Sequence, residues 1–125
     1  MNSWIVIAGS LCLFTTFVHI FAGQVNPIRP FLASNLNDEI KATLLTVWHM
    51  VTAVLLLTSL LFIYAGLFQI STLYSTVWAI SILYIIFAMI FWVVGAYYFK
   101  ARTFWMLPQW TIILPIGVLG LIGVW

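Results

Sequence analysis

Two histidines are the residues of this chain best suited to chemistry, because each lies in a strongly apolar stretch. His19 follows Thr15 by four residues and Thr16 by three, and Gly23 comes four residues later, so helical spacing brings all four near one helix face. Ionisable groups inside membrane segments are costly and usually face protein or water. The pattern therefore predicts a polar site around His19.

The second histidine has a similar setting. His49 directly follows Trp48 and lies on a three-residue row with Thr43, Thr46 and Thr52. Hydroxyl groups at such positions can fix the imidazole tautomer or bond across a helix interface. Because the two apolar stretches are neighbours in the sequence, a meeting of the two imidazoles is geometrically reasonable, although the sequence does not decide whether they face each other. The polar pocket expected around them comprises Thr15, Thr16, Thr46, Trp48 and Thr52.

Two histidines on facing helices are the usual axial ligands of a b-type haem in a membrane bundle. On this hypothesis His19 and His49 bind the iron, and Gly23 leaves room for the porphyrin. The basic residues that could meet the haem propionates are Arg29, Lys41 and Arg102. The same histidines could contribute to a copper or zinc site, although two are too few ligands to complete one. The plainer alternative is that both hydrogen-bond within the protein or to lipid headgroups.

The composition of the chain indicates whether these residues are surrounded by water or by lipid. The chain of 125 residues is 66% hydrophobic and only 5% charged, whereas about a quarter of the residues in a soluble domain are charged. Six charged side chains cannot cover a water-facing surface, so we expect a lipid bilayer around most of the chain. A net charge of +2 without a dense basic patch does not indicate nucleic-acid binding.

Four apolar stretches are long enough to cross the ~30 Å hydrocarbon layer, which requires about 20 residues. They cover residues 3–22, 42–68, 73–99 and 107–125. The second helix is expected to begin earlier, at residue 38, because Asn37 can cap it and Asp38 and Glu39 suit the positive end of its dipole. We therefore expect one all-α domain, residues 1–125, forming an up-down-up-down bundle of four transmembrane helices.

The connections differ in length and charge. The long first connection contains Pro30 followed by spaced apolar residues, which predicts a short helix lying in the membrane interface between the first two spans. Residues 69–72 form a short uncharged turn, which predicts an antiparallel hairpin of the second and third spans. Three glycines spaced by three residues predict close packing of the fourth helix; they are Gly117, Gly120 and Gly123.

The basic residues predict the orientation in the membrane. Arg29 and Lys41 belong to the first connection, Lys100 and Arg102 belong to the third, and the opposite side has none. The positive-inside rule then places both connections in the cytoplasm and both termini outside, which is the periplasm in a bacterium.

Three parts of the chain resemble a known family: the segment from His19 to Gly23, the segment from Arg29 to Leu32, and the pair Trp48-His49. Together they resemble a family of small bacterial four-helix integral membrane proteins with a His-x-x-x-Gly, Arg-Pro-x-Leu and Trp-His pattern. The resemblance implies a location in the bacterial inner (cytoplasmic) membrane. It implies no particular activity.

Several functions are compatible with these features. The most specific is a haem or metal protein that transfers electrons through a histidine-centred site. The first alternative is a non-catalytic accessory subunit or assembly factor that binds another membrane protein. A second is a homo-oligomeric channel or transporter, which the lack of an intramembrane acid disfavours. A non-enzymatic role is preferred, because the chain shows no nucleophile–base pair and no phosphate-binding glycine loop.

Overall fold

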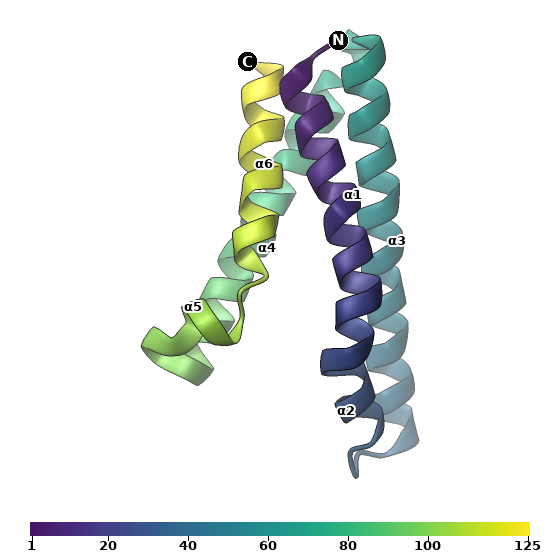
Figure 1. Ribbon diagram of the computed structural model, residues 1–125, viewed down its shortest axis with the longest axis vertical. Helices are drawn as coiled ribbons and strands as arrows, with labels where there is room; N and C mark the ends of the chain where they lie inside the picture. Colours follow the sequence, from purple (N-terminus) through teal and green to yellow (C-terminus); the bar gives the residue numbers. More distant parts are fainter.

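The computed structural model describes all 125 residues and is helical, with no β-strand. Its four main helices are α1 (Ser3–Gly23), α3 (Asp38–Phe68), α4 (Tyr74–Phe99) and α6 (Trp110–Val124). Two short helices, α2 (Arg29–Leu32) and α5 (Thr103–Met106), lie in the first and third connections. Three segments are long and apolar enough to cross a membrane: Ser3–Leu32, Asp38–Phe68 and Ser71–Met106. Figure 1 shows both chain termini at the same end of the molecule.

The fourth helix is shorter than expected. It begins at Trp110 rather than at residue 107, because Leu107 is extended, with φ −129° and ψ 70°. Proline disfavours the α conformation in the residue before it, and Leu107 precedes Pro108. The resulting helix has 15 residues. At 1.5 Å per residue it is about 22 Å long, which is less than the hydrocarbon thickness of a bilayer.

The predicted start of α3 is confirmed. The side-chain oxygen of Asn37 accepts a hydrogen bond from the backbone N–H of Ile40 at 2.9 Å, and Asp38 and Glu39 occupy the first turn. Asn2 caps α1 in the same way, with its side-chain oxygen 3.3 Å from the backbone nitrogen of Ile5. Each cap satisfies a backbone N–H that has no partner inside its helix.

A short helix does follow the first span, as expected. After α1, the turn Gln24–Ile28 leads directly into α2, which carries Pro30 in its first turn. A proline fits there because the first helical residues have no intrahelical acceptor for an N–H group. Figure 1 shows α2 below the end of α1, at the end of the molecule opposite the termini.

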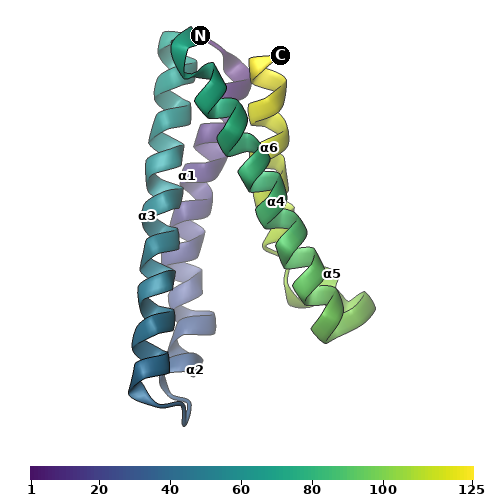
Figure 2. The ribbon, with the colours of Figure 1, turned by 180° about the vertical axis from the view of Figure 1, so that it is seen from behind.

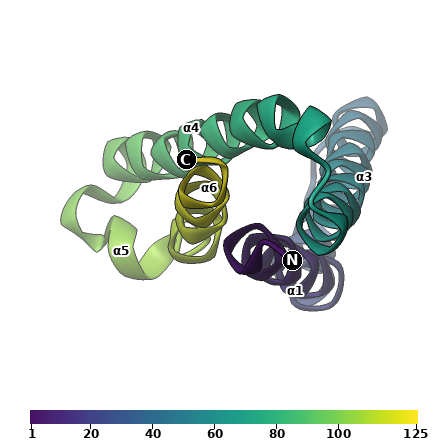
Figure 3. The same cartoon turned by 90° about the horizontal axis from the view of Figure 1, so that it is seen from above.

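The main helices form two pairs rather than a closed ring. α1 packs along α3, α4 packs along α6, and the contact of α1 with α6 joins the pairs. Figure 2 and Figure 3 show the pairs meeting near the termini and separating toward the opposite end. The short turn connects α3 to α4, but these two helices contact each other little.

Glycine allows α6 to approach its neighbouring helices closely, as the sequence predicted. A Cβ atom at Gly117 would lie 2.7 Å from the Ile85 side chain, and one at Gly123 would lie 2.5 Å from that of Ile5. At Gly120 it would meet the side chains of Ser81 and Phe62. Small residues let helix backbones approach closely in membrane proteins, where van der Waals packing drives association.

Candidate functional site

The imidazole of His19 packs on the indole of Trp48. The ring centroids are 3.8 Å apart and the planes differ by 16°. The Nε2 atom of His19 lies 3.3 Å from the backbone carbonyl oxygen of Trp48. Because a carbonyl oxygen can only accept, Nε2–H is the donor, and the free lone pair of the neutral ring is on Nδ1. Trp48 therefore contacts His19 through both its side chain and its backbone.

Two further predicted residues support this pair. The hydroxyl of Thr52 donates to the same Trp48 carbonyl oxygen at 3.1 Å. Gly23 is buried, and a Cβ atom there would overlap the Trp48 indole. The absence of a side chain at Gly23 thus makes room for tryptophan in this structure. We refer to His19, Gly23, Trp48 and Thr52 as the His19–Trp48 cluster.

The other threonines of the predicted pocket make no hydrogen bond to either imidazole. Thr15 and Thr16 are buried, and their hydroxyls donate to the carbonyls of Leu11 and Cys12 at 2.8 and 2.9 Å. Thr46 is exposed and donates to the Ala42 carbonyl at 2.9 Å. Hydroxyls bonded to the preceding helical turn are satisfied without a ligand.

His49 lies outside the cluster. It is exposed, and its ring makes no hydrogen bond to any other part of the chain. The side chains of Trp48 and His49 leave α3 in different directions because adjacent helical residues do not share a face. The packing of α1 on α3 therefore brings His19 onto the tryptophan rather than onto the neighbouring histidine.

A haem between His19 and His49 of one chain does not fit this arrangement. The Trp48 ring covers one face of His19 and fills the space beside Gly23, so a porphyrin there would have to displace it. No group of three or more His, Cys, Asp or Glu side chains is placed to hold a metal ion. If either group binds, His49 is the imidazole that needs no rearrangement to reach it.

The basic residues that were expected to bind the haem propionates do not lie together. Arg29 begins α2 and Lys41 lies in the first turns of α3, both at the free end of the α1/α3 pair. Lys100 and Arg102 form the turn between α4 and α5, at the free end of the other pair. Figure 1 shows these two ends separated from each other.

A buried polar cluster escaped the sequence reasoning. Cys12 is fully buried, and its thiol takes part in hydrogen bonds. Its sulfur lies 3.0 Å from the hydroxyl oxygen of Tyr84, which is 2.6 Å from the hydroxyl oxygen of Thr58. The Cys12 thiol also faces the Leu55 carbonyl oxygen at 3.4 Å. This Cys12–Thr58–Tyr84 cluster links α1, α3 and α4.

One signal could have found it. Tyr84 lies in the middle of a strongly apolar helix, where a buried phenol hydroxyl needs a hydrogen-bond partner. The polar residues at similar depth on the other helices were the natural partners. All three side chains are satisfied within the chain, so the cluster fixes the helix arrangement and leaves no group directed at a ligand.

No protein-family model, curated protein or solved structure matches this chain. The geometry of its own residues therefore carries the functional argument.

Proposed function

We propose that this chain is a four-span protein of the bacterial inner membrane, serving as a non-catalytic accessory subunit or assembly factor. Its helices cross in up-down-up-down order, with both termini in the periplasm and α2 at the cytoplasmic interface. The partner is another membrane protein, which binds the exposed side of α3 around His49. The exposed imidazole of His49 is the observation that carries this proposal.

The distribution of charge supports the placement in the membrane. All four basic residues lie at the end opposite the termini: three in the two connections there, and Lys41 near the start of α3. Basic connections are retained in the cytoplasm. The short α6 can cross if the bilayer thins locally around it, which costs fractions of a kcal/mol per Å of mismatch. A phosphatase reporter fused after Trp125 should be active, since that enzyme works only in the periplasm; an inactive fusion would contradict the orientation.

His49 supports the partner because its environment is incomplete. An ionisable side chain on a transmembrane helix normally faces protein or a water-filled cavity. The acids of this chain cannot supply a partner, since Glu39 lies ten residues earlier on α3. That separation is about 15 Å along the helix axis. A carbonyl or carboxylate on a helix of a second protein would satisfy the imidazole.

Site-specific photo-cross-linking in the native membrane tests the partner. A photoreactive residue at His49 should cross-link to a protein other than this chain. The matched control is the same residue at Leu57, two turns further along α3 and 69% exposed, which should cross-link to lipid. The His49→Leu variant, which should insert normally, should lose the co-purifying protein, whereas Leu57→Val should retain it.

Two outcomes would overturn this role. Cross-linking from position 49 to lipid alone would show that no protein covers the imidazole. Cross-linking to a second copy of the chain would show a homo-oligomer in place of an accessory subunit.

A b-type haem is the second candidate function, and the exposure of His49 is the observation that favours it. In this proposal His49 supplies one axial ligand of the haem and another chain supplies the second, while His19 remains stacked on Trp48. Haem would give the protein a redox centre for electron transfer. Protein purified from its native membrane should then show a Soret band that is lost in His49→Leu and kept in His19→Gln. Loss of the band in His19→Gln alone would contradict this ligand set.

A further inference from the structure

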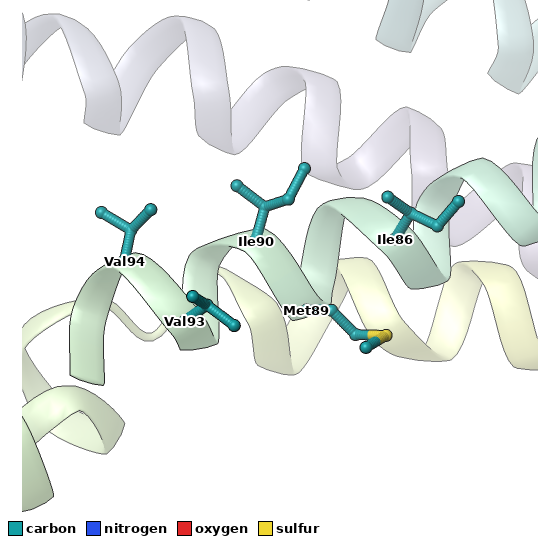
Figure 4. A pocket seen from close by; sticks show the side chains of 5 residues that line it. All are labelled: Ile86, Met89, Ile90, Val93 and Val94. Atoms are coloured by element: carbon teal, nitrogen blue, oxygen red, sulfur yellow. The ribbon is translucent and has the colours of Figure 1, made fainter. Parts of the chain in front are cut away.

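The third apolar helix carries a groove that no other helix of the chain fills. Five side chains line it, all of them apolar, and its volume is about 310 Å³. They are Ile86, Met89, Ile90, Val93 and Val94. Each of these side chains is between 45% and 60% exposed. Figure 4 shows Ile86, Ile90 and Val94 pointing away from α6, which packs on a different side of α4.

Two basic residues follow the groove in the chain, the first of them six residues after Val94, the last residue of the lining. Lys100 and Arg102 follow α4 directly, and both are exposed. No acidic residue lies near them in the sequence, because the only two acids of the chain are Asp38 and Glu39 at the start of α3. The free end of the α4/α6 pair therefore carries two uncompensated positive charges. The free end of the α1/α3 pair carries two positive and two negative charges, which balance.

The dimensions of this surface match one leaflet of a bilayer. From Ile86 to Lys100 is 14 residues along the chain, which corresponds to about 21 Å of helix. Half of the full bilayer thickness, headgroups included, is about 20–22 Å. A phospholipid with its headgroup at Lys100 has the right length to lie along the groove as far as Ile86.

We infer that α4 binds an anionic phospholipid, with the phosphate group between Lys100 and Arg102 and an acyl chain in the groove. The inference rests on the membrane placement proposed above and concerns a different face from His49. The two basic residues beyond the groove favour a phospholipid over a transmembrane helix of a partner, since such a helix would need no negative charge there. Basic pockets on the cytoplasmic side of membrane proteins are known to bind anionic lipid headgroups.

Lipid binding to the purified full-length protein tests the inference. The protein is extracted in mild detergent, stripped of lipid, and titrated with phosphatidylglycerol or phosphatidylcholine, with bound lipid counted by native mass spectrometry. We expect phosphatidylglycerol to bind more tightly. The Lys100→Gln/Arg102→Gln variant should lose most of this preference, roughly fivefold in affinity for each basic residue. The control Arg29→Gln/Lys41→Gln, with the same change in net charge, should keep it.

A second pair of variants tests the groove itself. Val94→Trp fills it and should weaken phosphatidylglycerol binding, whereas Leu57→Trp on the exposed side of α3 should not. Circular dichroism and gel filtration confirm that each variant is folded. Equal binding of the two lipids, or equal losses in the two charge variants, would overturn the inference. Because the protein is first recovered from the membrane, such a result would leave its proposed membrane placement intact.

Discussion

Trp48 contacts His19 in two ways: its indole stacks on the imidazole, and its backbone carbonyl oxygen accepts the Nε2–H of the ring. This relationship ties α1 to α3 toward the end of the molecule where the two helix pairs diverge. It also divides the histidines by role. His19 is hydrogen-bonded inside the chain, whereas the exposed imidazole of His49 makes no hydrogen bond within it.

Gly23→Ala should destabilise the protein, although alanine normally favours a helix over glycine by about 1 kcal/mol. The new methyl group would overlap the Trp48 indole. We expect the free energy of unfolding to fall by about 1–3 kcal/mol, the usual effect of overpacking. Denaturant unfolding in detergent measures it. In a Trp48→Leu background the same change should be neutral or stabilising, and destabilisation of equal size there would show that Trp48 is not the obstacle.

The His19 imidazole should be the neutral Nε2–H tautomer near neutral pH. The Trp48 carbonyl can only accept a hydrogen bond, so the proton must be on Nε2. Nitrogen-15 solid-state NMR of histidine-labelled protein in lipid distinguishes the two tautomers. The His49→Leu variant assigns the remaining signal to His19. An Nδ1–H signal from His19 would contradict the contact.

Tyr84→Phe should have a modest cost. It removes the hydroxyl between Cys12 and Thr58, but both of these side chains keep backbone carbonyl partners. Side-chain hydrogen bonds between membrane helices contribute about 0.6 kcal/mol on average and about 1.7 at most. We expect a loss in that range when the protein is unfolded in detergent mixtures. Tyr97→Phe is the control, because Tyr97 is 81% exposed. An equal loss of stability in Tyr97→Phe would show that the Cys12–Thr58–Tyr84 cluster does not stabilise the protein.

Cys12 should react with a maleimide only when the helices separate. Its side chain is fully buried, and it is the only thiol of the chain. Thiol chemistry requires access of the reagent to the thiolate, so labelling of the folded protein should be at least about tenfold slower than in denaturing detergent. A Cys12→Ser/Trp125→Cys variant provides a freely accessible thiol for comparison. Rapid labelling of the folded wild type would place Cys12 at a surface.

The local features of the fold could be predicted from neighbouring residues. The composition indicated a helical chain rich in spanning segments, and Asn37 with Asp38 and Glu39 fixed the start of α3. The glycine spacing of α6 correctly predicted close packing. The shortened start of α6 was also within reach, because Pro108 disfavours a helical conformation at Leu107. These effects act within a few residues of each other and need no knowledge of the rest of the chain.

The composition of the candidate site depended on contacts between distant segments. The spacing identified His19, Gly23, Trp48 and Thr52 as notable residues, but only the rotation of α1 against α3 placed His19 on Trp48 and left His49 outside. A helix with apolar residues on every side has no strong preferred face, so its rotation is set by shape and hydrogen bonding between helices. For the same reason the Cys12–Thr58–Tyr84 cluster and the separation of the two helix pairs appear only in the tertiary structure.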